Sequence, residues 1–465
     1  MESPLLADNK SGVVEVLRVG LPASASMLGR TMTQFVDGVM VARTGQAAFI
    51  GQRVGALVAF VPEAFSIGII GVINTFVSQN LGAGRSRRCG QYAWAGLGIC
   101  GILSAIFLPL FFLAKPLFSL INHAADVQIN EVLYFRYMIL AMPLTMSIRA
   151  LESFFYGLHK PRVVVTISIF ANAVNVVGNY VLIFGKFGMP AMGLKGAAIA
   201  TVASWSLQFT ILLIVFLSRN THLRFGTRFV RAVRFSHFRD IFRVGWPAGI
   251  SFFIDLTTWT VFTTLLVGHF GKTHLAAAQA AARYMTLSFM PAIGMSIATT
   301  ALVGRYIGMG RRDLARKRAH CALRITMIYM GVCALIFFFF RHWLIGLFAH
   351  HNPVGLDKEV AMQEMIVVGG RIMICAAVFQ LFDACNIIFN GALRGAGDTR
   401  WPMVVMFMLS TVVLVGGGTA MVIYLPQLKS LGPYIAATAW VVLLAPILTW
   451  RFESGAWRKI NLLRK

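Results

Sequence analysis

Acidic residues are scarce in this chain of 465 residues: 17 Asp and Glu stand against 42 Lys and Arg, which gives a formal net charge of +25. Charged residues of both signs make up only 13% of the chain, whereas 57% is hydrophobic and the mean hydropathy is +0.73. A water-soluble surface cannot be built from so few charges. The basic residues gather in short loops between apolar runs, which argues against nucleic-acid binding and indicates membrane topology.

Motifs for enzymatic or metal chemistry are also missing. The six cysteines show no CxxC or CxH spacing, so the sequence predicts neither a disulfide framework nor a zinc site. The segment Gly268–Thr273 lacks the four-residue spacer of a phosphate-binding loop. We therefore expect a protein that is not an enzyme, is not driven by ATP and carries no metal or other cofactor.

Long apolar runs fill the chain instead. Runs of roughly 18 to 25 residues recur along the whole length, and each can cross a hydrocarbon core of ~30 Å as a helix. The first run, Val13 to Leu28, has the composition of a signal peptide, but the repeat described next identifies it as a retained first helix. The sequence predicts an all-α membrane protein with twelve transmembrane helices, near 13–42, 53–81, 92–115, 131–157, 162–184, 195–217, 244–270, 280–308, 320–349, 362–395, 401–424 and 433–450.

The chain contains an internal repeat. Arg18-Val-Gly-Leu-Pro22 returns as Arg243-Val-Gly-Trp-Pro247 at an offset of 225 residues, and Asn80–Arg85 returns as Tyr306–Arg311 at 226. Two anchors at nearly one offset indicate a parallel repeat, and hence two pseudo-symmetric six-helix bundles. We predict an N-terminal half at 1–217, a basic cytoplasmic linker at 218–243, a C-terminal half at 244–450 and a basic cytoplasmic tail at 451–465.

The basic residues also predict an orientation. Alternate loops carry most of them, for example Arg85 to Arg88, Arg311 to Arg318 and Arg394 to Arg400, whereas the opposite loops have only scattered charges such as Arg43 and Lys272. Since cytoplasmic loops retain Lys and Arg, we expect both termini in the cytoplasm of a multi-pass plasma (inner) membrane protein. The basic linker would lie on anionic membrane lipid, and we expect a monomer.

Four carboxylates fall at predicted membrane depth: Asp37, Glu63, Asp255 and Asp383. A charge at that depth costs several kcal/mol, so it persists where it faces a cavity or a partner. A carboxyl group among apolar neighbours takes up a proton readily, and two or three together can hold Na⁺, with Asp255 and Asp383 as the candidate pair. The four residues are candidate coupling sites; the structural alternative for each is an ion pair that joins helices.

Arg30 offers such an ion pair. The repeat offset equates Arg30 with Asp255, so a salt bridge between the halves is expected, either as a gate or as a static strut. Asp37, two turns further along the same helix, competes for Arg30, and Glu63 has Arg30 or Arg53 as alternative partners. Arg149 and Glu152 are expected to form a local i,i+3 pair.

The remaining candidates are expected to contact substrate or to gate. Asn172, Asn175 and Asn179 share one stripe of a helix, as interhelical hydrogen-bonding residues do. Arg283 is expected either to meet an anionic group of the substrate or to snorkel. Several aromatic residues neighbour the carboxylates and can stack on flat cations, with ordinary packing as the alternative. The full set is Arg30, Gln34, Phe252, Phe253, Trp259, Gln279, Arg283, Tyr284, Phe379, Asn172, Asn175 and Asn179.

These residues carry a family resemblance that extends over nearly the whole chain. The sequence resembles the multidrug and toxic compound extrusion (MATE) family, in particular its NorM-type branch. The matching stretches are Gly20-Leu-Pro22, Val36-Asp37-Gly38, Phe76 to Arg85, Gly157 to Arg162, Ala277 to Gln279, Leu302 to Arg305 and Asn390 to Arg400.

The resemblance implies an antiporter that rocks between inward and outward states, in which entering Na⁺ or H⁺ drives an organic compound out. Asp37 and Asp383 match acidic positions of the family, and Asp255 stands where the NorM-type branch usually has Glu. Arg30, Arg283 in place of a common Asn, and Phe379 in place of a coordinating Tyr depart from the family. Because they add positive charge and remove a ligand, we expect H⁺ rather than Na⁺ coupling and substrates that are neutral, zwitterionic or mixed in charge. The alternatives are a flippase for lipid-linked oligosaccharides, whose diphosphate Arg30 and Arg283 would bind, and less favoured, a channel.

Overall fold

The computed structural model describes residues 9–121, 123–229, 233–349 and 358–463, and throughout these ranges the regular elements are helices. The first half contains α1 (Asn9–Ala42), α2 (Gln46–Gly71), α3 (Ile73–Gly82), α4 (Ser86–Phe107), η1 (Leu108–Phe111), α5 (Ala114–Ser119), α6 (Ala125–Gly157), α7 (Pro161–Phe184) and α8 (Gly193–Leu217). The second half contains α10 (Phe235–Val261), η3 (Phe262–Val267), η4 (Gly268–Phe270), α11 (Lys272–Gly308), α12 (Arg312–Phe339), α13 (Arg341–Ala349), α14 (Lys358–Ala396), α15 (Arg400–Leu409), η5 (Ser410–Gly417), α16 (Gly418–Tyr424), η6 (Pro426–Leu428), α17 (Leu431–Glu453) and η7 (Ala456–Lys459), with α9 (Arg219–Phe225) between the halves.

The predicted fold class is confirmed. Eleven helical segments of the described chain are long and apolar enough to cross a membrane, and α1, with 34 residues, supplies the twelfth helix of the bundle. Some segments join several elements: α2 runs into α3, α10 continues through the π-helical turn η3, and α15 continues through η5 into α16. Each helix satisfies its own backbone, as a lipid environment requires.

Several helices extend beyond their predicted boundaries. The helix predicted at 244–270 begins at Phe235, so much of the predicted linker at 218–243 is helical, in α9 and the first turns of α10. Likewise, the helix predicted at 280–308 begins at Lys272. The prediction followed the apolar run, which marks the hydrocarbon thickness, whereas the helices continue into the polar boundary and stop at turns such as Gly271, which has a φ of 92°.

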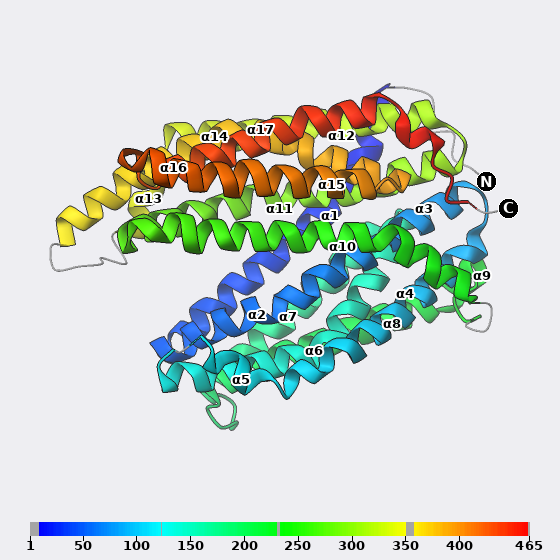
Figure 1. Cartoon of the computed structure of the whole chain (residues 1–465). Coiled ribbons are helices and arrows are strands. Elements are labelled where there is room, and N and C mark those ends of the chain that lie inside the picture. The colour runs from blue at the N-terminus through cyan, green and yellow to red at the C-terminus, as the bar shows by residue number, and fades with distance from the viewer. Residues whose placement is uncertain (1–8, 122, 230–232, 350–357, 464–465) are drawn as a thin grey trace.

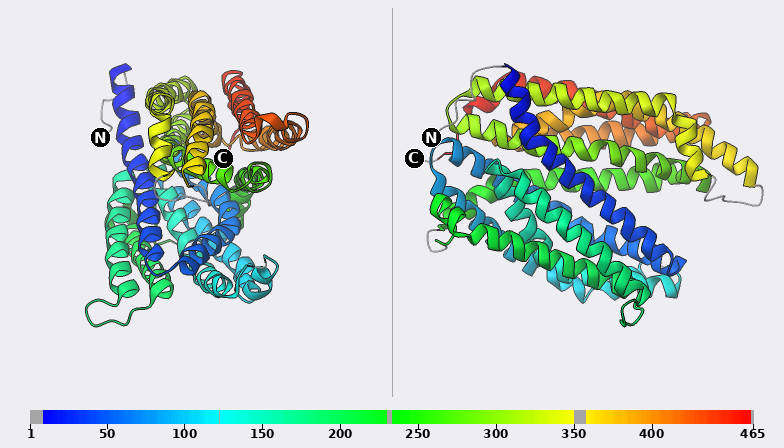
Figure 2. Two further views of the ribbon diagram at one scale, coloured as in Figure 1. Left: turned by 90° about the vertical axis from the view of Figure 1, so that its left-hand side faces the viewer. Right: turned by 180° about the vertical axis from the view of Figure 1, so that it is seen from behind.

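The two halves form separate bundles with separate cores (Figures 1 and 2). The first helix of each half reaches into the other half. Val16 near the start of α1 packs with Met295 and Leu302 of α11, and Ile241 near the start of α10 belongs to the N-terminal core. Figure 2 shows α1 running diagonally from one bundle to the other. The halves are therefore joined by two long helices that belong to both.

An ion pair fixes the start of α1 in the C-terminal half. Glu15 accepts a hydrogen bond from Arg318 Nε of α12 at 2.7 Å, and the hydroxyl of Tyr306 in α11 donates to the same carboxylate at 2.8 and 2.9 Å. The Arg318 guanidinium also lies over the Tyr306 ring. This cluster holds the terminal end of α1 against the opposite bundle.

Glycines allow the crossing helices to touch. A methyl group at Gly294 of α11 would lie 2.4 Å from the backbone of Ser24 in α1, and one at Gly68 of α2 would lie 2.5 Å from the backbone of Ala248 in α10. The repeat offset of 226 equates Gly68 with Gly294, so the α1–α11 and α2–α10 crossings are equivalent under the pseudo-symmetry. Only glycine permits backbones to approach this closely.

The halves close at the end where both termini lie and diverge toward the opposite end (Figures 1 and 2). Three side chains hydrogen-bond across the closed end: Asn74 Nδ2 to the carbonyl of Ile297, Thr75 Oγ1 to that of Arg394 and Gln79 Nε2 to that of Gly395, at 2.9 to 3.1 Å. His159 Nε2 adds a bond of 3.2 Å to the carbonyl of Ala301. These contacts hold the two halves together at the end where the termini lie.

Candidate functional site

Asp37 is the centre of a buried polar cluster in the N-terminal half. The side chain of Asn179, on α7, donates to Asp37 Oδ1 at 2.5 Å and to Asn175 Oδ1 at 3.2 Å, and Asn175 donates to Thr201 Oγ1 of α8 at 3.4 Å. The Tyr134 hydroxyl of α6 lies within electrostatic range of Asp37. The asparagine spacing of four residues places both amides on one face of α7, as the sequence predicted. The third candidate, Asn172, is half-buried near Gly29 of α1 and is not hydrogen-bonded to this cluster within the described part of the chain.

Arg30 forms an ion pair within its own half. Its Nη2 atom lies 3.3 Å from Glu152 Oε1 of α6, while Arg149 lies 3.7 Å from the other carboxylate oxygen. Gln208 of α8 donates to Glu152 at 3.2 Å. This corrects the expected Arg30–Asp255 bridge: in the described part of the chain no ion pair joins Arg30 to Asp255 or Asp37. The local Arg149–Glu152 pair is confirmed.

Glu63 lies near the same cluster. It follows Pro62 in α2, beside Thr145 of α6 and within electrostatic range of Arg30. Arg30 is therefore held between a direct partner, Glu152, and a more distant carboxylate, Glu63.

The C-terminal half holds the other two carboxylates. Asp255 of α10 and Asp383 of α14 are half-buried, and their charges lie close enough to interact. The Trp259 indole lies beside Asp255 and packs edge-on against Trp440 at 6.0 Å between ring centroids. Neither carboxylate is in an ion pair within the described ranges. Two acids close enough to interact, without a cation partner, can share a proton or bind a small cation.

Residues near Asp383 tie α14 to α11. Gln380 Nε2 donates to Ser288 Oγ at 2.6 Å, and Phe379 is buried. The hydroxyl of Tyr284 donates to the carbonyl of Leu344 at 2.8 Å, and its ring packs against Phe348 of α13. Tyr284 therefore joins α11 to α13, and its place beside the carboxylates stays a prediction.

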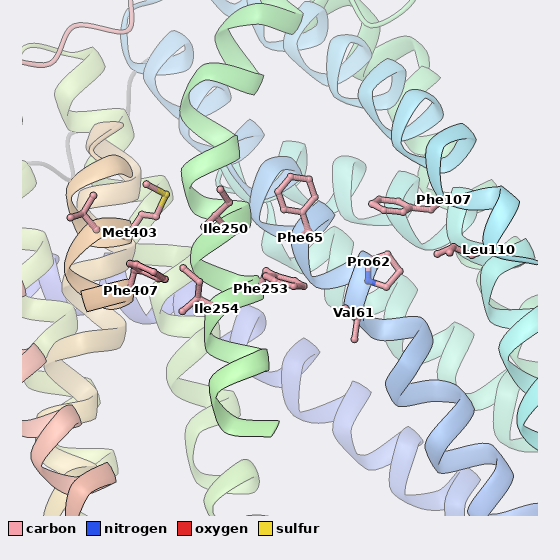
Figure 3. A pocket seen from close by; sticks show the side chains of 11 residues that line it. Val61, Pro62, Phe65, Phe107, Leu110, Ile250, Phe253, Ile254, Met403 and Phe407 are labelled. Carbon is pink, nitrogen blue, oxygen red and sulfur yellow. The ribbon is translucent and has the colours of Figure 1, made fainter. Parts of the chain in front are cut away.

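Phe253 and Asp255 lie on the same helix, but their side chains point in different directions. It lines an open, wholly apolar cavity of about 840 Å³ between the halves, shown in Figure 3. Residues two apart on a helix point about 200° apart, so Phe253 and Asp255 occupy different faces of α10. Phe252 is half-buried on the same helix. The lining comes from α2, α4, η1, α10 and α15: Val61, Pro62, Phe65, Phe107, Leu110, Ile250, Phe253, Ile254, Met403, Val404 and Phe407.

The polar candidates nearer the open end are exposed. Exposed side chains are found at Gln34 of α1, Arg53 of α2, and Gln279 and Arg283 of α11. The guanidinium of Arg53 lies over the Phe49 ring, 5.7 Å from its centroid, and within electrostatic range of Arg283. Each of the diverging halves thus has one exposed arginine near the open end, Arg53 in the N-terminal half and Arg283 in the C-terminal half.

Sequence reasoning missed four participants. Gln208, Thr201 and Tyr134 contact the N-terminal clusters but have no charge to mark them in an apolar run. For Glu152 the sequence predicts the local pair with Arg149 but not the ion pair with Arg30. A stripe of polar residues on α8, Thr201, Ser204 and Gln208, is the signal that the sequence offers for this face.

Known proteins resemble the chain over nearly its full length. The MatE family model matches residues 22–181 and 247–418. The probable multidrug resistance protein NorM of Pseudomonas syringae pv. tomato is 28% identical over 461 residues, covering 97% of this chain and 96% of the relative. The protein of that name from Thermotoga maritima is 27% identical over 460 residues, covering 97% and 94%.

Solved structures support the same fold. A MOP superfamily transporter from Pyrococcus furiosus has a TM-score of 0.86 at 18% identity, with 98% of both chains covered. A multidrug resistance MATE family transporter described as outward-facing gives the same TM-score, identity and coverage.

Proposed function

Because the chain belongs to the MatE family, the multidrug and toxic compound extrusion transporters, we propose that it is a proton-coupled antiporter that exports drug-like organic compounds. Proteins of this family are multi-pass membrane transporters, not enzymes, and they need no cofactor. The NorM relatives are named multidrug resistance proteins, which supports small organic substrates for this chain as well.

The two halves, 1–217 and 244–450, are the bodies that move. The loops at the closed end are the basic ones, which supports our proposal that both termini lie in the cytoplasm and that the open end faces outside. With this orientation we propose that the protein lies in the plasma (inner) membrane and that the described conformation is its outward-facing state. The two glycine crossings supply close contacts about which the bundles rock, while the hydrogen bonds of Asn74, Thr75 and Gln79 have to break before the cytoplasmic end opens.

The environment of Asp37 carries the proposal. Its carboxylate is buried at membrane depth, and its hydrogen-bond donor is the neutral amide of Asn179. An isolated carboxylate there is costly, so Asp37 is stabilised by binding a proton or a cation. The departures noted above favour H⁺, because Phe379 in place of a coordinating Tyr removes a ligand for Na⁺ and Arg283 in place of a common Asn adds positive charge.

Asp255 and Asp383 provide a second uptake site. Because their charges repel, one proton held between them relieves the repulsion and its loss restores it. A proton entering down a membrane potential releases ~2.3 kcal/mol per 100 mV, which is sufficient to drive a modest outward substrate gradient. In the proposed cycle, the carboxylates of the two halves take up protons when substrate leaves and release protons when substrate binds.

Dye efflux from proteoliposomes tests this function. A proton gradient and a Na⁺ gradient are imposed separately on wild-type protein and on the Asp37→Asn and Asp383→Asn variants. We expect efflux with the proton gradient alone, and its loss in both variants while the protein still elutes as a folded species. Efflux driven by Na⁺ alone would refute proton coupling, and unaltered efflux by both variants would remove these carboxylates from the mechanism.

A further inference from the structure

Arg53 and Arg283 belong to opposite halves of the protein. Arg53 lies seven residues into α2 and Arg283 eleven residues into α11, each counted from the open end. At ~1.5 Å per residue these positions are ~11 and ~17 Å along their helices, within the spanning segments. Both side chains are exposed. Two permanent positive charges are thus carried into the membrane from the two sides of the open end.

Neither arginine has a carboxylate partner in the described ranges, and this sets the pair apart from its neighbours. Arg30 and Arg149 are paired with Glu152, and Arg318 is paired with Glu15. The contact of Arg53 is the face of Phe49. Since an arginine at this depth costs several kcal/mol without a partner, a pair of them persists where a ligand or water meets it.

The two guanidinium groups lie close enough for their charges to repel, although they are held by helices of different bundles. Gln279 lies four residues before Arg283, on the same exposed face of α11, and adds an amide donor. Planar guanidinium groups bind oxyanions through paired N–H donors, so this arrangement favours an anion over a cation.

We propose that Arg53 and Arg283, with Gln279, bind the oxyanion group of the transported compound in the outward-facing state, as a bridge between the halves. This inference rests on the proposed function and narrows it to compounds that carry a carboxylate or phosphate. A basic or apolar remainder of the same compound then faces Asp255 and Asp383. The oxyanion can come from a free organic acid or from a lipid phosphate, and the test separates the two sources.

Dye binding to the purified protein tests the site independently of transport. Rhodamine B carries a free carboxylate, and its ethyl ester has the same ring system without that charge. Fluorescence anisotropy gives Kd for both dyes with wild-type protein, Arg53→Gln, Arg283→Gln and the control Arg43→Gln, an exposed arginine at the end of α1. We expect wild-type protein to prefer the acid, and each site variant to weaken its binding about tenfold, the range of one charge-assisted hydrogen bond. Binding of the ester should change less than twofold, and Arg43→Gln should bind both dyes as wild-type protein does.

Other outcomes overturn the inference. Equal wild-type affinity for acid and ester, or equal losses for both dyes in the variants, would show that the arginines do not recognise the oxyanion. If the dyes bind as expected but no ion gradient moves them, the proposed function fails while the site stands. Two assays separate the sources of the oxyanion. Dihexanoyl phosphatidic acid and benzoate are compared as competitors of dye binding, and a fluorescent long-chain phosphatidic acid is followed in vesicles. Stronger competition by the lipid together with its movement between leaflets assigns the oxyanion to a lipid, whereas stronger competition by benzoate without such movement assigns it to a free acid.

Discussion

Replacing Gly294 by Ala should impair both stability and transport, because Gly294 lies at the α1–α11 crossing. The new methyl group would sit 2.4 Å from the backbone of Ser24, with further backbone atoms of Ala23 at 2.7 Å. Carbon atoms in contact lie at about 3.5–4.0 Å, so the two helices have to separate by about 1 Å. No side-chain rotation relieves the clash, since the opposing atoms belong to the backbone.

The expected loss is about 1–3 kcal/mol of unfolding free energy, the range for overpacking a well-packed site. Gly101 of α4 gives a matched control, because it is exposed within a helix and a methyl group there meets nothing within 4 Å. Gly101→Ala should stabilise the protein by about 0.5–1 kcal/mol through helix propensity. Thermal unfolding in detergent and the initial rate of dye efflux are measured for both variants.

The symmetry adds a second test. Gly68→Ala at the α2–α10 crossing should reproduce the effect, since its methyl group would lie 2.5 Å from the Ala248 backbone. If Gly294→Ala unfolded and transported like wild-type protein while Gly101→Ala behaved as expected, these crossings would not be the close contacts about which the halves move.

Three further outcomes follow from the charged contacts. Glu152→Gln should lower the free energy of unfolding by about 1–3 kcal/mol, measured as a lower melting temperature, since Arg30 and Arg149 both lose their acid. The control Glu364→Gln, in an exposed pair with Lys429, should lower it by about 0–1 kcal/mol. Glu15→Gln should increase the labelling, from the terminal side, of a cysteine placed at Ser78, which lies against Gly304 of α11 at the closed end, because α1 loses its tie to Arg318 and Tyr306. Unchanged labelling would mean that this cluster does not hold the closed state. Burial lowers the pKa of His159 from 6.5 to about 3, so between these values the unfolded chain takes up a proton that the folded protein does not, and stability falls as the pH drops from about 6.5 toward 3. His159→Asn, which tolerates the φ of 57°, should flatten melting temperature against pH in this window, and an unchanged slope would contradict that assignment.

Much of the fold followed from the sequence because lipid leaves few choices. An apolar run long enough to cross the bilayer has to be helical, and the repeat groups the runs into two bundles. Hydropathy does not predict helix starts such as Phe235, because it marks the boundary of the hydrocarbon and not the first residue with helical backbone. The contacts of Asn175 and Asn179 could be anticipated, because their spacing fixes a shared face.

The partner of Arg30 could not be derived in the same way. Residues that are equivalent under a two-fold repeat meet only when they lie near its axis. The α1–α11 contact occurs at Ser24, and six residues later Arg30 is already inside the N-terminal bundle, where Glu152 is closer than Asp255. The approach of Arg53 and Arg283 was equally hidden, because it depends on how far the two bundles have separated.

Substrate-driven proton movement is the most direct test of the central claim that buried carboxylates couple ion uptake to export. A pH-sensitive dye reports proton flux across the membrane of proteoliposomes when rhodamine B or its ester is added to the side that the cytoplasmic face of the protein contacts, without an imposed ion gradient. We expect counterflow of protons with wild-type protein and none with the Asp37→Asn/Asp255→Asn/Asp383→Asn variant. Proton flux of wild-type size in that triple variant would contradict the claim.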